Sequence, residues 1–331
     1  MITAIDLDDT GWLLDAETDS PVPEHRLSGY FAANLAPPTW ATDIVVYVHG
    51  WQTSPESACR AAARLLSLAE RQLRTARGLY PRLDQHPSSF APWTVVVRWP
   101  SSSLVTPGGY RRIRDRAHAM GAEGHAAHII GRLLGYLDAE RPDPGSAAVL
   151  ANREGQYLHL VGHSFGCRFV CEAVQWAGDA TLNKAGTLGW GLPAVSGRPF
   201  TADSMLLFQM AAPRDAFTTL FASLATAPLH GPVVATHSRH DRATGFWHLR
   251  AERSPGVGHS GIGVAPSPLF NGFLLPSDRG YPHQTLDHRF VNLDASAYFM
   301  RGRKLNPAGA HSDHLRPESA HLLLSLADHC R

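Results

Sequence analysis

The sequence predicts an α/β fold with a mostly parallel central sheet and helices on both faces. Short apolar runs, such as DIVVYVHG at residues 43–50, alternate along the chain with stretches of helical spacing, such as residues 54–76. This alternation is typical of βαβ units, whose strands pair in parallel and whose crossovers are right-handed. Of the 331 residues, 44% are hydrophobic and 18% are charged, which suits a sizeable core. We therefore expect a single α/β domain over residues 1–331.

The elements follow from the apolar patterns in chain order. AIDL and GWLLDA near the N-terminus are separated by an Asp-Asp-Thr turn, which predicts one or two antiparallel strands at the sheet edge. Ser-Pro-Glu at residues 54–56 suits the start of a helix. Further strands are expected at residues 43–50, 93–100, 157–162, 204–213, 231–238 and 289–296, and helices at residues 54–76, 111–140, 215–226 and 316–330.

Two segments, residues 178–203 and 244–288, do not fit the alternation. The first is rich in Gly, Thr and Pro, and the second contains SPGVGHSGIGVAPSP. Loops of this length are uncommon in compact domains unless they serve a function. We therefore expect both insertions to form the walls or lid of a pocket.

Charge and cysteine content exclude several classes of protein. The 30 Lys and Arg against 29 Asp and Glu give a formal charge of +1 without a basic stripe, so we expect no nucleic-acid partner. The four cysteines form no C-x-x-C pair and are interpreted as structural thiols. The acidic start lacks the layout of a signal peptide, and no apolar run reaches the length of a membrane span. A cytoplasmic protein without stable membrane insertion is expected, whereas the sequence leaves its oligomeric state open.

The stretch LHLVGHSFGCRFV at residues 158–170 contains the motif G-x-S-x-G. A predicted strand precedes Ser164 and a helix-compatible run follows it, which is the setting of a nucleophile elbow. Such a turn forces the serine into a strained backbone conformation. The flanking Gly162 and Gly166 lack a Cβ, so strand and helix can pack closely. The alternative interpretation is an ordinary tight strand-to-helix turn.

With YVHGW, RWPS, GHSFG, HSRHD and HSDHLRPESAHLL in this order, the chain resembles the α/β-hydrolase superfamily from about residue 43 onward. Within it, the chain is most similar to bacterial serine esterase and lipase-like members of undefined substrate. The resemblance implies an α/β-hydrolase fold with loop insertions forming a lid. It also implies a catalytic serine, acid and histidine in that chain order.

The resemblance assigns Ser164 as nucleophile, Asp241 as acid and His311 as base. Asp241 follows the strand at residues 231–238; its alternative interpretation is a turn residue that caps its own backbone. Asp294, at the end of a later strand, remains an alternative acid. His314 remains an alternative base, because both histidines lie between the last strand and the last helix.

The resemblance also implies an oxyanion hole made of two backbone N–H groups. One belongs to Phe165, after the nucleophile, and the other to Trp51 in the HGW sequence, with Gln52 as second choice. Gly50 lets this backbone approach the reacting carbonyl. Aromatic residues could line a pocket for an acyl chain or simply pack: Trp51, Phe165, Trp176, Trp190, Phe246 and Trp247.

We therefore expect a carboxylic ester hydrolase that acts on a small-molecule ester or acyl substrate through an acyl-enzyme, without metal or organic cofactor. One alternative is a non-catalytic α/β-hydrolase-fold protein that binds a ligand. Another is an acyltransferase that uses the same triad. A metal site at His311, Asp313 and His314, or at His237, His240 and Asp241, is less favoured because neither has a known zinc spacing.

Overall fold

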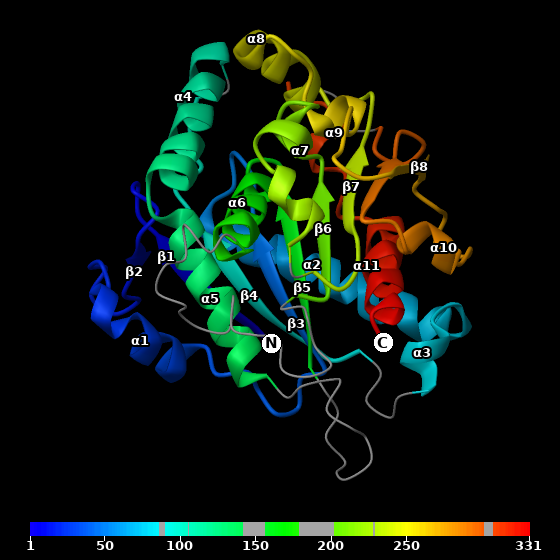
Figure 1. The fold of residues 1–331 in the computed structure, drawn as a ribbon, viewed down its shortest axis with the longest axis horizontal. Coiled ribbons are helices and arrows are strands. Elements are labelled where there is room, and N and C mark those ends of the chain that lie inside the picture. Colours follow the sequence, from blue (N-terminus) through cyan, green and yellow to red (C-terminus); the bar gives the residue numbers. More distant parts are fainter. Residues whose placement is uncertain (86–89, 105, 142–155, 179–201, 228, 301–306) are drawn as a thin grey trace.

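A twisted sheet between two layers of helices forms the centre of the molecule in the computed structural model (Figure 1). The structure describes residues 1–85, 90–104, 106–141, 156–178, 202–227, 229–300 and 307–331. Over these ranges, the sheet has nine strands in the order β2-β1-β4-β3-β5-β6-β7-β9-β8. Neighbours are parallel except for the pair of β1 (Ile2–Leu7) and β2 (Leu13–Leu14). The prediction of an α/β fold with a mostly parallel sheet is confirmed, as is the antiparallel pair at its edge.

Six further strands lie near their expected positions: β3 (Asp43–Val48), β4 (Pro92–Arg98), β5 (Tyr157–His163), β6 (Ser204–Phe208), β7 (Val233–His237) and β9 (Phe290–Asp294). A seventh, β8 (Leu269–Phe273), was not expected. This strand lies at the edge of the sheet, and its sequence LFNGF is half-buried to exposed. Such a strand lacks the β-branched run that identifies a buried strand in a sequence.

The described residues form these helices: α1 (Leu27–Asn34), α2 (Pro55–Thr75), α3 (Pro81–Gln85), α4 (Pro107–His118), α5 (Ala126–Glu140), α6 (Gly166–Gly178), α7 (Ala216–Thr219), α8 (His248–Glu252), α9 (Val257–Ser260), α10 (His283–Leu286) and α11 (Pro317–His329). Shorter 3-10 or π turns are η1 (Glu24–Arg26), η2 (Arg77–Leu79), η3 (Ala119–Glu123), η4 (Ala222–Ala225), η5 (Ala243–Trp247) and η6 (Ala310–Ser312). The predicted start of α2 is confirmed, since Ser54 Oγ accepts a hydrogen bond from the Ser57 N–H at 3.2 Å.

Two predicted helices are interrupted. Residues 111–140 form α4, the π turn η3 and then α5, because the chain turns at Gly124, which packs against the N-terminal hairpin. A Cβ at Gly124 would lie 2.4 Å from the Thr10 carbonyl oxygen. Residues 215–226 form only α7 and η4, with Phe217 and Phe221 buried beneath them.

The predicted insertion at residues 244–288 is not one continuous loop. It contains α8, α9 and α10, and β8 belongs to the central sheet. Most of the other predicted insertion lies outside the described residues, since residues 179–201 are not among them. A lid therefore stays a prediction.

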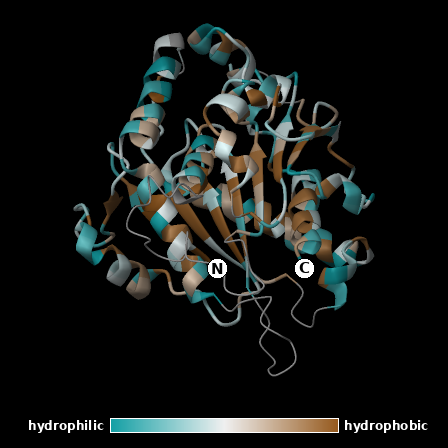
Figure 2. Ribbon diagram, viewed as in Figure 1, coloured by the Kyte–Doolittle hydropathy of each residue, from teal (hydrophilic) through white to brown (hydrophobic). Residues whose placement is uncertain are grey.

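Alternating strand residues build one apolar core on each face of the sheet. Ile44 and Val46 point toward the core beneath α5 and α6, whereas Val45 and Tyr47 point toward the core beneath α2 and α11. Figure 2 shows the strands as the most hydrophobic part of the ribbon, with mixed colours on the surrounding helices. Among the described residues, no helix is both long and apolar enough to cross a membrane.

The amino ends of the strands hold a buried polar network. Asp43 Oδ1 lies 2.9 Å from His159 Nε2, and His159 Nδ1 lies 2.8 Å from Ser204 Oγ. The Arg331 guanidinium donates to Asp43 Oδ2 at 2.8 Å. These contacts connect β3, β5 and β6 to Arg331. They lie at the end of the sheet opposite to the turn between β5 and α6.

Candidate active site

Ser164 occupies the turn between β5 and α6 in a strained conformation. Its φ is +57°, in the left-handed region that non-glycine residues seldom adopt. The flanking glycines make this turn possible. A Cβ at Gly162 would lie 2.6 Å from Cys167 Cα, and one at Gly166 would lie 2.2 Å from the Val48 carbonyl oxygen. The predicted strained serine between two closely packed glycines is therefore present.

The loop after β3 lies directly against this turn. A Cβ at Gly50 would lie 2.6 Å from Ser164 Cβ, so only glycine fits without displacing the serine. The Gln52 N–H donates to the Ser101 carbonyl oxygen at 3.1 Å. By contrast, the N–H groups of Trp51 and Phe165 donate to no acceptor among the residues that the structure describes. Of the proposed donors, Trp51 and Phe165 are thus available, and Gln52 is engaged elsewhere.

His311 and Asp241 form a buried pair. His311 Nδ1 lies 2.8 Å from Asp241 Oδ2, and their side chains are 4% and 0% exposed. Because a carboxylate only accepts hydrogen bonds, Nδ1 carries the proton in this contact. His311 Nε2 is buried without a hydrogen-bond partner in the described parts of the chain. The free nitrogen is therefore the one that a general base would use.

Two groups that the sequence analysis did not identify hold Asp241 in place. The Thr244 N–H donates to Asp241 Oδ1 at 3.0 Å, and Gln209 Nε2 donates to Oδ2 at 3.1 Å. Gln209 Nε2 also donates to the Ala310 carbonyl oxygen at 3.0 Å, which ties the loop of the acid to that of the histidine. Gln209 follows β6 with a φ of +48°. A polar residue after a buried strand was the only sequence signal for it.

His163 links His311 to the serine turn. Its Nε2 donates to the His311 carbonyl oxygen at 2.9 Å, and the two ring centroids are 4.8 Å apart. Burial lowers the pKa of His163 well below its ordinary value, and the neighbouring His314 and His311 lower it further. His163 is therefore neutral, and because it directly precedes Ser164 it positions the backbone of His311 beside the turn.

The two alternative residues lie apart from this pair. His314 stacks on His163 with ring centroids 4.0 Å apart, and its Nε2 faces the Tyr47 hydroxyl at 3.5 Å. Burial lowers the pKa of His314 to about 3, and no carboxylate among the described residues pairs with it. Asp294 accepts a hydrogen bond from the Ser296 N–H at 2.8 Å at the end of β9. The structure thus brings Asp241 and His311 together, and neither His314 nor Asp294 joins them.

The predicted aromatic residues divide between the site and other regions. Trp51 and Phe165 both contact the ring of Tyr110, at centroid distances of 5.3 and 5.4 Å. Trp176 instead packs edge-on against His128. Of the lid candidates, Phe246 is 49% exposed, Trp247 donates to the Pro307 carbonyl oxygen, and Trp190 lies outside the described residues.

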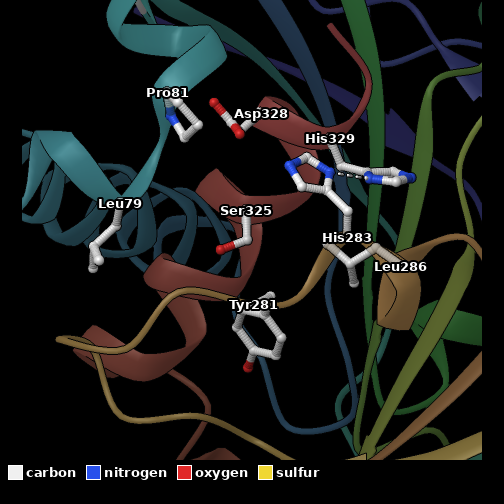
Figure 3. A pocket seen from close by; sticks show the side chains of 8 residues that line it. All are labelled: Leu79, Pro81, Tyr281, His283, Leu286, Ser325, Asp328 and His329. Atoms are coloured by element: carbon white, nitrogen blue, oxygen red, sulfur yellow. Dashed lines mark hydrogen bonds between the residues drawn. The ribbon is translucent and has the colours of Figure 1, made fainter.

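A separate pocket of about 210 Å³ lies between α3, α10 and α11 (Figure 3). His283 and His329 approach each other there, with 3.4 Å between their Nδ1 atoms. None of the predicted site residues lines this pocket. In the described ranges, no group of three or more His, Cys, Asp or Glu side chains is placed to hold a metal ion.

The chain matches no protein-family model, and a search of curated proteins gave no match. The arguments about function therefore depend on the site itself.

Proposed function

We propose that the protein is a serine hydrolase of the α/β-hydrolase fold that cleaves a carboxylic ester. The observation that carries this proposal is the buried His311–Asp241 pair with its free Nε2. His163, which directly precedes the serine in the left-handed turn, contacts His311. Nucleophile, acid and base also follow one another along the chain in the order typical of this fold. The backbone donors of Trp51 and Phe165 supply the remaining part of such a site.

In the proposed reaction, His311 Nε2 takes the proton from Ser164 Oγ as the oxygen attacks the carbonyl carbon of the ester. The N–H groups of Trp51 and Phe165 stabilise the resulting oxyanion. The imidazolium, held by Asp241, then gives its proton to the leaving alcohol, and the acyl group stays on Ser164. Water attacks this acyl-enzyme by the same route, which releases the acid and restores the serine.

The proposal is tested by the hydrolysis of 4-nitrophenyl hexanoate. We expect wild-type protein to release nitrophenolate, and Ser164→Ala to lower kcat by at least about three orders of magnitude, because no acyl-enzyme can form. Ser103→Ala is a matched control, because it removes a serine hydroxyl that only makes structural hydrogen bonds. Ser103 Oγ accepts from the Trp51 indole N–H and donates to the Gly109 carbonyl oxygen. Equal activity in wild type and Ser164→Ala would rule out this serine as nucleophile.

A further inference from the structure

One helical turn beyond the candidate nucleophile lies a buried arginine, Arg168, whose guanidinium donates no hydrogen bond to any residue that the structure describes. Arg168 is 6% exposed, and the nearest carboxylate oxygen is Glu172 Oε1, 3.9 Å from its Nε. A buried cation without hydrogen bonds is costly. The ion pair with Glu172 therefore leaves the hydrogen-bonding capacity of the Arg168 guanidinium unused.

Tyr110 presents a second unsatisfied polar group next to the predicted oxyanion donors. Its ring contacts Trp51 and Phe165, the residue is 2% exposed, and among the described residues its hydroxyl has no hydrogen-bond partner. Burial raises the pKa of Tyr110 well above its ordinary value; Asp241 and Glu252 raise it further, and Arg168 lowers it. The hydroxyl therefore stays protonated and can donate.

A third group comes from the segment after β7. His248 is 1% exposed and its Nδ1 donates to the Ser254 carbonyl oxygen at 2.8 Å, whereas its Nε2 has no hydrogen-bond partner in the described parts of the chain. Arg114 of α4 donates to the Ala251 carbonyl oxygen of α8 at 2.7 Å, which joins the elements that carry Tyr110 and His248. Figure 1 shows α4 and α8 meeting beyond the start of α6. Beyond the effect of burial, Arg168 lowers the pKa of both Tyr110 and His248, so these groups from α4, α6 and α8 lie within electrostatic reach of one another.

We propose that the substrate of this site carries a carboxylate, which the Arg168 guanidinium and the Tyr110 hydroxyl bind while Ser164 attacks the ester. This inference rests on the proposed hydrolase function. A guanidinium offers several donors in one plane and pairs with both oxygens of a carboxylate, and such charge-assisted hydrogen bonds are strong. An apolar acyl chain would leave these groups unsatisfied.

Glu172 is the group that a substrate carboxylate would replace beside Arg168. Its Oε2 has no hydrogen-bond partner within the described ranges and packs against η3, where a Cβ at Gly121 would lie 1.8 Å from it. Burial raises the pKa of Glu172 to about 7, although Arg168 acts in the opposite direction. Near neutral pH this carboxyl group is readily protonated, so an incoming carboxylate can become the counter-ion of Arg168.

The test compares 4-nitrophenyl hexanoate with mono-4-nitrophenyl adipate, in which a carboxylate replaces the terminal methyl group of the same acyl chain. Succinate and suberate monoesters and their neutral counterparts extend the comparison to shorter and longer chains. We expect wild type to have a higher kcat/KM for the carboxylate ester at one of these lengths or more. Arg168→Gln should lower the ratio of the two kcat/KM values by roughly 10- to 100-fold.

Three variants sharpen this test. Glu172→Gln should raise the same ratio, because it removes the competing carboxylate. Tyr110→Phe, which is nearly isosteric, should lower it severalfold. Arg71→Gln removes the same charge from an exposed position on α2, on the other face of the sheet, and should leave the ratio unchanged.

Labelling by a neutral fluorophosphonate separates this inference from the proposed function. If wild-type Ser164 is not labelled, the hydrolase proposal fails. If Ser164 is labelled but no carboxylate ester is preferred, or if the preference survives in Arg168→Gln, the carboxylate inference is wrong and the hydrolase proposal stands. Should Arg168→Gln fail to fold, Arg168→Lys and Tyr110→Phe decide, and unchanged ratios in both overturn the inference.

Discussion

The Asp241 carboxylate determines, at the scale of single residues, which nitrogen of His311 remains free. It accepts hydrogen bonds from His311 Nδ1, Gln209 Nε2 and the Thr244 N–H, at 2.8, 3.1 and 3.0 Å. With these donors in place, the carboxylate keeps the His311 proton on Nδ1, and Nε2 keeps its lone pair. The pairing with His311 belongs to Asp241, the acid that its position along the chain favoured, and not to the alternative Asp294.

Asp241→Asn tests this role of the carboxylate. An amide at this position can donate to Nδ1, which favours the wrong tautomer of His311. We expect kcat for 4-nitrophenyl hexanoate to fall by about three to four orders of magnitude, with little change in the thermal melt. Asp294→Asn is the matched control and should stay within a fewfold of wild type. If Asp294→Asn lowered kcat more than Asp241→Asn does, Asp294 and not Asp241 would be the acid.

The neutral histidines behind the site predict how stability depends on pH. Burial lowers the pKa of His314 to about 3 and that of His49 to about 4, against about 6.5 in the unfolded chain. At pH values between the folded and the unfolded pKa, the unfolded state binds more protons than the folded state. The free energy of unfolding therefore decreases as the pH falls below about 6.5.

His314→Phe should weaken this dependence, because it removes one group that the fold keeps neutral. Urea unfolding at pH 7 and pH 5 should show a smaller decrease than in wild type, by up to about 1.4 kcal/mol per pH unit. The exposed His25 offers a control, and His25→Phe should retain the wild-type slope. An unchanged slope in His314→Phe would show that His314 is not kept neutral by burial.

At the scale of elements, the turn between β5 and α6 depends on the loop after β3. Gly50→Ala would place a Cβ 2.6 Å from Ser164 Cβ and 2.9 Å from His163 Nδ1. We expect this variant to lose about 2 kcal/mol or more of stability, because packed backbone must shift, and to lose most esterase activity. Gly29→Ala in α1 meets no atom within 4 Å and should be neutral or stabilising by about 0.5–1 kcal/mol. Equal stability of the two variants would contradict the close approach.

Elements were predictable from the sequence where their pattern was strong and local. The six buried strands and the long helices α2 and α11 were identified because their apolar periodicity persists over several residues. The breaks at Gly124 and after α7, and the edge strand β8, were not, because tertiary contacts determine them. Likewise, G-x-S-x-G identified the turn, but the roles of Gln209 and Arg168 depend on contacts between distant segments.

At the scale of the whole molecule, a second combination of Ser, His and Asp lies at the end of the sheet opposite to the proposed triad. Asp43, His159 and Ser204 form hydrogen bonds of 2.9 and 2.8 Å at the amino edge, and all three are at most 1% exposed. Arg331 binds the same aspartate. This set has a triad's side chains without free backbone donors beside the serine, since the first residues of β6 are paired within the sheet. We interpret it as structural.

Asp43→Asn should therefore affect stability. Because it removes the buried charge that Arg331 and His159 both contact, we expect the free energy of unfolding to fall by about 3–5 kcal/mol. Asp84→Asn, which breaks the exposed pair with Arg77, should cost less than about 1 kcal/mol. Urea unfolding at pH 7 measures both, and equal losses would contradict the structural role of the network.

The most direct test of the proposed active site is the mass of the intact protein after treatment with a fluorophosphonate, followed by location of the adduct by peptide mass spectrometry. We predict a single adduct on Ser164 in wild type, none on Ser204, and none in folded Ser164→Ala. An adduct on another residue, or an unmodified and folded wild-type protein, would contradict the assignment of Ser164 as an activated nucleophile.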